Sequence, residues 1–172
     1  MAANYLGNAQ MSNLRPILTY RMTLPKMWSN KLIVGRLFLQ ESNRKQMEYM
    51  CTSGLPQYQS WQSWHQAGLG PIPPCLDLNL EYYQVQVIPI DMRTMIGVSG
   101  LFYKILPHIM RTDKYRRSDF GIHWDANIPG TAGCIGFRDV KEWGNFQMRM
   151  MRIQEEGHKT VPLVVEYLQP SL

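Results

Sequence analysis

The sequence of 172 residues has few charged residues and no long hydrophobic run. Charged residues make up 18% of the chain, below the roughly 25% that is typical of soluble domains. Hydrophobic residues make up 45%, which is enough for a core and excludes intrinsic disorder as a description of the whole chain. No window approaches the ~18 consecutive apolar residues of a membrane-spanning helix, so we predict no membrane insertion. The start of the chain has neither a basic head nor an apolar run, so we predict no cleaved signal peptide.

Cysteine and histidine are too few, and too irregularly spaced, for a disulfide scaffold or a zinc site. The odd number of cysteines (Cys51, Cys75 and Cys134) leaves at least one thiol unpaired in a monomer. A bridge between Cys51 and Cys75 remains open. No Cys-x-x-Cys occurs and the histidines lack zinc-ligand spacing, so we predict no bound metal and no cofactor.

Acidic residues are absent from the first 40 positions, and this absence accounts for the net charge of +5. Basic and acidic residues balance in the rest of the chain. A local positive excess favours an acidic partner, such as a protein, an anionic wall or membrane surface, or nucleic acid. The basic residues are evenly spread and form no block, which disfavours nucleic acid; they are Arg15, Arg21, Lys26, Lys31 and Arg36.

The order of residue patterns predicts a mostly β domain, a compact sandwich or barrel, with one helix in the C-terminal half. Gly, Pro, Gln, Ser and Trp dominate residues 54–74, which predicts a long loop. Apolar residues recur at helical spacing over 139–155 and predict one buried stripe, formed by Val140, Trp143, Phe146, Met150 and Ile153. Segments rich in β-branched and apolar residues predict strands at 17–23, 32–39, 47–53, 82–90, 101–105, 119–124 and 160–168. We divide the chain into a basic arm with the first strand, residues 1–29, and a domain over 30–172.

The stretch from Ser118 to Arg138 contains the residues best suited to catalysis. A predicted strand presents His123, a turn follows at 127–130, and the small residues of 131–136 surround Cys134. A tight hairpin here would bring the imidazole within hydrogen-bond reach of the thiol, as thiol activation requires. The alternative is a buried, inert cysteine.

Further groups of this stretch have candidate roles around the thiol. Small side chains allow close approach of the backbone to a ligand, so the amides of Gly133 and Cys134 could donate to an oxyanion. Asp125 follows His123 by two positions, on the same strand face, where it could orient the imidazole. An activated Cys134 would be alkylated by iodoacetamide well below pH 8.

These residues resemble the signature of the L,D-transpeptidase catalytic domain (YkuD-type), a His followed by [Ser/Thr]-His-Gly-Cys. His123 matches the first histidine, and the second motif is matched by Thr131, Gly133 and Cys134. Ala132 replaces the second histidine, and this GTAGC variant is similar to sequences in phage proteins and secreted antibacterial effectors. The resemblance covers roughly residues 30–168, and weaker parts occur in the family's order: Cys51–Gly54, Gly70–Pro73 and Arg116/Arg117 before Phe120–His123.

The resemblance implies a β-sandwich or barrel-like fold and a cysteine enzyme acting on the stem peptides of peptidoglycan. Cys134 would form an acyl-enzyme and His123 would take the thiol proton. An amine acceptor would give transpeptidation or exchange, and water would give carboxypeptidase activity; the residues leave this choice open. We assign substrate binding to Thr131, Arg116, Arg117 and Trp124.

A second hypothesis is a phage tail or capsid protein, structural or wall-binding, that retains the fold without activity. The missing second histidine favours it, as do the basic residues of 1–40, which would dock onto other virion or secretion-machine proteins. His123 and Cys134 favour the enzyme. Without a signal peptide, we expect synthesis in the cytoplasm and action at the cell wall or in a virion after delivery by a route other than Sec.

Overall fold

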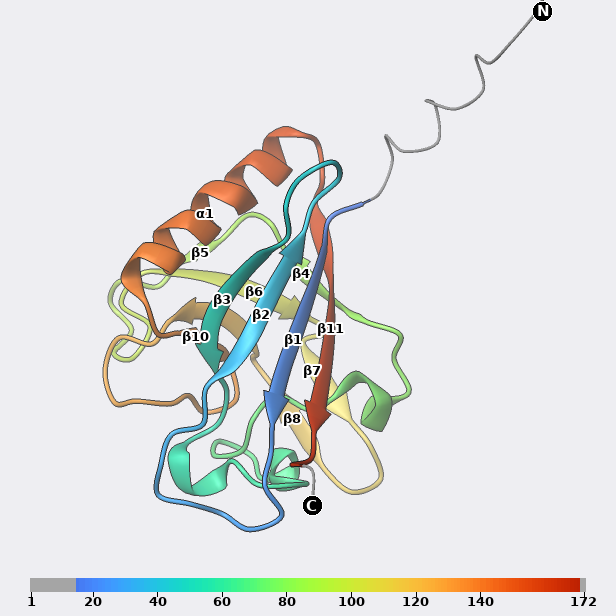
Figure 1. The fold of residues 1–172 in the computed structure, drawn as a ribbon, viewed down its shortest axis with the longest axis vertical. Helices are drawn as coiled ribbons and strands as arrows, with labels where there is room; N and C mark the ends of the chain where they lie inside the picture. Colours follow the sequence, from blue (N-terminus) through green and yellow to red (C-terminus); the bar gives the residue numbers. More distant parts are fainter. Residues whose placement is uncertain (1–14, 171–172) are drawn as a thin grey trace, which may run out of the picture.

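Eight strands close into a β-barrel in the computed structural model, which describes residues 15–170 (Figure 1). The sheet order is β4-β11-β1-β2-β3-β10-β9-β6-β5, and pairing of β4 with β6 closes the barrel. The first and last strands, β1 and β11, lie side by side in parallel, as do β9 and β10. The strands of the sheet are β1 (Ile17–Thr23), β2 (Gly35–Gln40), β3 (Met47–Thr52), β4 (Tyr83–Gln86), β5 (Ile90–Asp91), β6 (Leu101–Leu106), β9 (Gly121–Trp124), β10 (Ile135–Phe137) and β11 (Thr160–Leu168).

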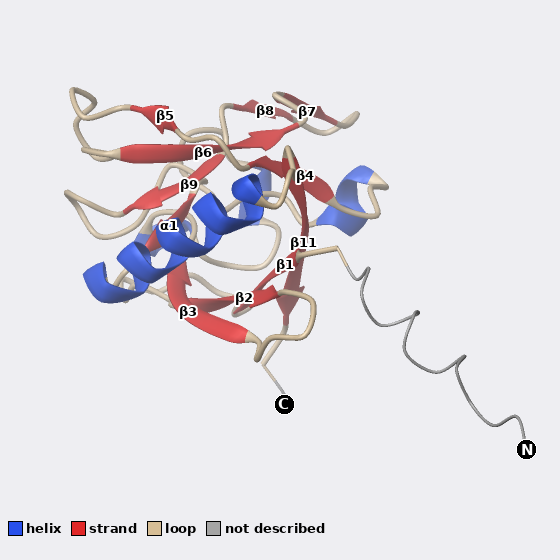
Figure 2. Ribbon diagram, turned by 90° about the horizontal axis from the view of Figure 1, so that it is seen from above, coloured by secondary structure: helices blue, strands red, loops and turns tan. Residues whose placement is uncertain are grey.

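The helix α1 (Val140–Glu155) lies between β6/β9 and β2/β3 and covers one side of the barrel interior (Figure 2). Asp139 caps it, because its carboxylate accepts hydrogen bonds from the amides of Lys141 and Glu142 at 2.8 and 2.9 Å. Four of the five predicted stripe residues are buried. Val140, in the first turn, is 66% exposed, so its prediction as a core residue is wrong.

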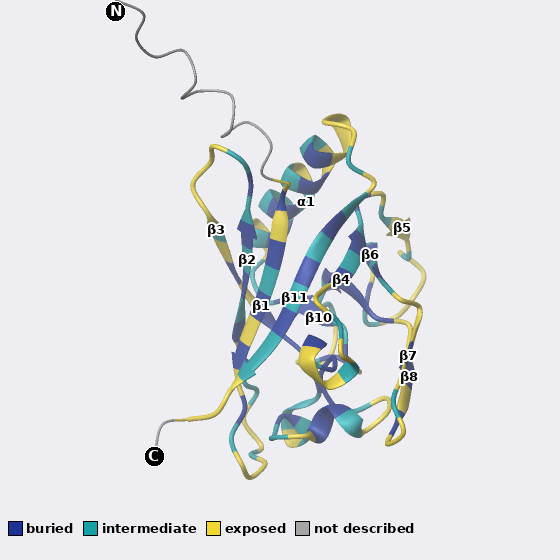
Figure 3. Cartoon of the chain, turned by 90° about the vertical axis from the view of Figure 1, so that its right-hand side faces the viewer, coloured by how far each residue is buried: buried dark blue, intermediate teal, exposed yellow. Residues whose placement is uncertain are grey.

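Alternating side chains fill the barrel. Buried and more exposed residues alternate along β1 and β11, as Figure 3 shows, because successive side chains of a strand point to opposite faces. The predicted mostly β fold with one helix is confirmed. Residues 1–14 of the predicted arm lie outside the described residues, whereas β1 pairs with both β2 and β11.

The shortest strands depart from the sequence prediction. The predicted strand 82–90 is broken into β4 and β5, and Pro89 lies in the break, where it has no amide to donate. Between the predicted strands 101–105 and 119–124, where no strand was predicted, the chain forms a hairpin of β7 (Ile109–Arg111) and β8 (Arg116–Ser118). The predicted loop 54–74 contains two short 3-10 helices, Pro56–Tyr58 and Ser63–His65, and a third spans Cys75–Leu78.

In residues 15–170, no helix is long and apolar enough to cross a membrane. That part of the chain also contains no group of three His, Cys, Asp or Glu residues arranged to hold a metal ion. All three cysteines are free, so Cys51 and Cys75 do not pair.

Candidate active site

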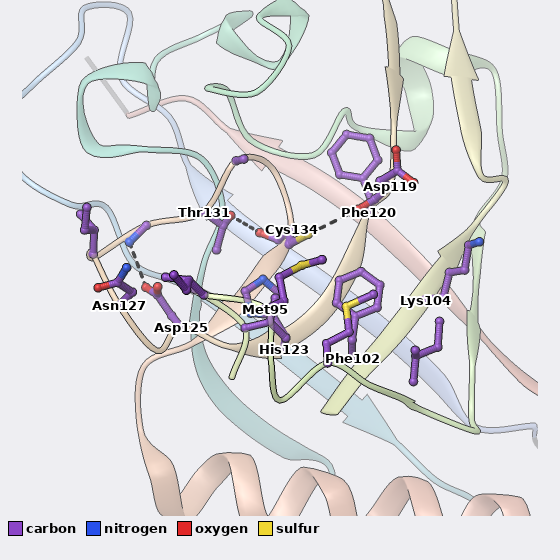
Figure 4. Close-up of a pocket in the computed structure, with 18 residues that line it drawn as sticks. Met95, Phe102, Lys104, Asp119, Phe120, His123, Asp125, Asn127, Thr131 and Cys134 are labelled. Atoms are coloured by element: carbon purple, nitrogen blue, oxygen red, sulfur yellow. Dashed lines mark hydrogen bonds between the residues drawn. The ribbon is translucent and has the colours of Figure 1, made fainter. Parts of the chain in front are cut away.

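A cavity of about 480 Å³ lies between the loop that joins β5 to β6 and the segment from Asp119 to Cys134 (Figure 4). Four of the predicted site residues line it: His123, Asp125, Thr131 and Cys134. The other predicted residues, Gly133, Arg116, Arg117 and Trp124, are not part of its lining.

His123 and Cys134 come from neighbouring parallel strands. In the register of β9 with β10, His123 pairs with Gly136 and Ile122 with Ile135. Cys134 immediately precedes β10 and therefore comes level with Gly121. Because side chains alternate along a strand, the thiol and the imidazole lie on the same face, one strand and two positions apart. Figure 4 shows both side chains at the same cavity.

A backbone carbonyl fixes the imidazole. Nδ1 of His123 donates to the carbonyl oxygen of Trp124 at 2.7 Å, which leaves Nε2 as the nitrogen able to accept a proton. The Phe102 ring stacks on the imidazole with ring centroids 5.9 Å apart. Burial lowers the pKa of His123, so the ring is neutral at pH 7.

The Cys134 thiol is held in its protonated form. Its Sγ donates to the carbonyl oxygen of Asp119 at 3.7 Å. Burial raises the pKa of this thiol to about 11, while the Gly121 amide and the Arg117 charge oppose that shift. The thiol is therefore protonated at pH 8, and attack by Cys134 requires a base such as His123.

Asp119 adopts an unusual backbone conformation next to the thiol. Its φ of 65° lies in the left-handed region, which costs free energy for a residue with a side chain. This conformation occurs where the chain passes from β8 to β9, and the carbonyl of the same residue accepts from Cys134.

Hydrogen bonds within the loop and from distant segments hold the backbone around Cys134. The hydroxyl of Thr131 accepts from the Gly133 amide at 3.3 Å, so one of the two predicted oxyanion donors is engaged within the loop. Three successive carbonyls each accept one hydrogen bond: Ala132 from Arg117 at 2.9 Å, Gly133 from Ser53 at 2.9 Å and Cys134 from Thr131 at 2.5 Å.

The buried side chain of Arg117 anchors this loop to the segment 64–71. It is only 4% exposed, and its guanidinium packs on the Phe120 ring at 4.8 Å. A β-carbon at Gly133 would lie 2.4 Å from the guanidinium, and Gly133 has a φ of 127°, so this position requires glycine. The guanidinium donates to four carbonyls, those of Trp64 (2.8 Å), Gly70 (3.0 Å), Pro71 (2.7 Å) and Ala132 (2.9 Å). Arg116 on the same strand is exposed, and Trp124 packs against the core.

Asp125 holds the turn that follows β9. Its carboxylate accepts from the Gly130 amide at 2.9 Å and pairs with Arg138 at 2.6 Å. The carbonyl of Trp124, and not this carboxylate, is the hydrogen-bond partner of the His123 ring.

Sequence reasoning missed one wall and one end of the cavity. Met92, Met95, Ile96 and Val98, in the loop between β5 and β6, form an apolar wall. Their cluster in an otherwise turn-like stretch is the signal that could have indicated it. The Ala126 amide donates to the Gly97 carbonyl at 3.4 Å and joins this loop to the turn after β9. Lys104 also lines the cavity, and its sequence context gives no such signal.

Comparisons of the chain with protein-family models, with curated proteins and with solved structures found no match.

Proposed function

We propose that this protein is a cysteine enzyme that acts on the stem peptides of peptidoglycan through an acyl-enzyme on Cys134. The observation that carries the proposal is that Cys134 and His123 line one cavity, with Nδ1 of the imidazole bound to a carbonyl and Nε2 left to accept a proton. The resemblance of their flanking residues to the L,D-transpeptidase signature supports peptidoglycan as the substrate.

The first step is the transfer of the thiol proton to Nε2 of His123 as Sγ attacks the carbonyl carbon of the third stem residue. The raised pKa of Cys134 means that this transfer accompanies attack, because little thiolate is present beforehand. The Cys134 amide would donate to the oxyanion that develops.

The second step expels the terminal D-amino acid. Its C–N bond breaks, His123 returns the proton to the departing amine, and the thioester on Cys134 remains. Water or an amine then attacks the thioester, and the thiol proton is restored. Hydrolysis, D-amino-acid exchange or a cross-link results according to the acceptor.

A second candidate is a virion or wall-binding protein that retains the fold without catalysis. The raised thiol pKa favours it, because an inert buried cysteine has the same property. Against this candidate, part of the positive charge of residues 1–40 that would serve docking is already paired within the protein. Arg21 pairs with Glu166, and Arg36 pairs with Glu48 at 2.7 Å.

Mass spectrometry of purified muropeptides separates the two candidates. The enzyme hypothesis predicts loss or exchange of a terminal D-amino acid, or a new cross-link between third residues, with the wild type and not with Cys134→Ala. Circular dichroism should show that the variant remains folded. No change with the folded wild type would leave the virion or wall-binding candidate.

A further inference from the structure

A second cavity lies on the outer face of the barrel, where β4, β11 and β1 lie side by side (Figure 3). Its volume is about 320 Å³, and it shares no lining residue with the candidate active site. Val161 is buried in the core, so its neighbours Thr160 and Pro162 point to the outer face, because side chains alternate along a strand. Gln84 lies opposite Pro162 in the pairing of β4 with β11, and its side chain therefore faces outward as well.

Three segments that are far apart in the sequence meet at this cavity. In the parallel pairing of β1 with β11, Leu18 lies opposite Leu163. Three positions earlier in each segment, Arg15 therefore comes level with Thr160, one strand spacing of about 4.8 Å away. The turn from α1 to β11 forms a second wall, and the start of β4 forms the third. The pairing of the barrel strands thus assembles the cavity from residues 15, 82–84 and 157–162.

Basic side chains line this cavity, and no carboxylate of the described chain does. The acidic residues nearest in the sequence, Glu81, Glu155 and Glu156, are outside the lining, and Glu156 lies 3.8 Å from Arg44. Among residues 15–170, the basic side chains of the cavity have no ion-pair partner; they are Arg15, His158 and Lys159. The charges of the arginine and the lysine are therefore not neutralised by the protein, and the cavity favours an anion.

Neutral groups of the cavity add hydrogen-bond donors. Tyr82 and Thr160 line it, and each carries a hydroxyl that can donate. The accessible end of the Gln84 amide is its nitrogen, a donor, because Oε1 is buried without a hydrogen-bond partner. A carboxylate has two oxygens to accept such bonds, whereas a phosphate ester has three strong acceptors and a charge of about −1.5 to −2 at pH 7. A phosphate ester therefore matches both the charge and the donors of the cavity better than a carboxylate does.

We infer that this cavity binds a phosphate ester through the charges of Arg15 and Lys159. Hydrogen bonds from Tyr82, Gln84 and Thr160 hold the phosphate oxygens. The inference goes beyond the proposed function, because this binding requires no residue of the candidate active site. A soluble phosphate ester and the phosphate of a lipid headgroup share this chemistry, so the test uses both.

Isothermal titration calorimetry with glycerol 3-phosphate, at constant ionic strength, tests the site. The wild type should bind the ester, and Arg15→Met and Lys159→Met should each bind it about tenfold more weakly, because each variant loses a charge-assisted hydrogen bond. Tyr82→Phe, which removes only a neutral hydroxyl, should weaken binding less. Lys45→Met replaces an exposed lysine in the loop between β2 and β3, outside the cavity; it is the matched control and should bind as the wild type does.

Folding and binding are separated by the melting temperature without ligand. Arg15 and Lys159 are exposed, so Arg15→Met and Lys159→Met should melt as the wild type does, and their weaker binding then reports the site. Cys134→Ala should bind the ester with wild-type affinity, so loss of the enzyme hypothesis would leave this inference intact.

Cosedimentation with vesicles distinguishes the two sources of phosphate. Binding to vesicles that contain phosphatidic acid, reduced by Lys159→Met and displaced by glycerol 3-phosphate, would identify a lipid headgroup. Binding of the soluble ester without binding to these vesicles would identify a soluble ligand. Binding of neither probe, or equal weakening by Arg15→Met and Lys45→Met, would overturn the inference.

Discussion

Replacing Arg117 by methionine tests whether a buried guanidinium holds the loop around Cys134. The side chain donates to four carbonyls on two segments, 64–71 and the cysteine loop. Each carbonyl that stays buried without a donor costs roughly 1–3 kcal/mol. The variant recovers part of this, because burial of the charge itself costs several kcal/mol. We expect a net loss of about 3–5 kcal/mol, a large share of the ~5–15 kcal/mol that stabilises a typical domain.

Arg116 provides the matched control, because it precedes Arg117 on β8 and is exposed. Arg116→Met should change the free energy of unfolding by less than about 0.5 kcal/mol. Urea unfolding followed by tryptophan fluorescence measures both variants. Arg117→Lys should recover only part of the loss, since lysine lacks the planar fork of donors. Equal, small effects of Arg116→Met and Arg117→Met would refute the anchoring role of Arg117.

Three further predictions concern Gly121, the reactivity of the Cys134 thiol and the effect of the three thiols on stability at high pH. Gly121→Ala should destabilise the fold by about 1–3 kcal/mol in urea unfolding, because the new β-carbon overlaps the Phe102 ring. Gly144→Ala, with open space in α1, should stabilise the fold by about 0.5–1 kcal/mol. A change of the same sign for both variants would contradict this packing. Alkylation of Cys134 by iodoacetamide should accelerate about tenfold per pH unit from pH 7 and continue to rise toward pH 11, and a plateau below pH 8 would contradict the raised pKa. Above about pH 9 the thiols of the unfolded chain lose protons that the native thiols retain, because the native thiol pKa values are raised. The contribution of the thiols to stability should therefore be full below about pH 9, and the melting temperature should fall toward pH 11. A melting temperature that stays constant over this range would contradict the raised thiol pKa values.

The long elements could be predicted from the sequence because their patterns are local. The strands at 17–23 and 160–168 have the bounds that alternation and β-branched residues predicted. The helix begins one residue later than predicted, at the cap formed by Asp139. The exposure of Val140 could not be predicted, because which first-turn residues face the core depends on how the helix lies on the barrel.

The roles of the charged residues in the site depend on tertiary packing, which the sequence does not display. Arg117 matched a family pattern and was assigned to substrate, yet the sequence does not show that carbonyls from residues 64–71 surround it. Asp125 lies on the expected strand face, but its carboxylate accepts hydrogen bonds from Arg138 and from the Gly130 amide, and not from the His123 ring.

Intact-protein mass spectrometry after rapid mixing with a stem tetrapeptide tests the central claim most directly. The account predicts a covalent adduct with the mass of the tetrapeptide minus its terminal amino acid, located on the peptide that contains Cys134. Cys134→Ala should carry no adduct. His123→Ala should form the adduct far more slowly, because the imidazole that accepts the thiol proton in the proposed mechanism is missing. A folded wild type that forms no adduct, or an adduct located at Cys51 or Cys75, would contradict the account.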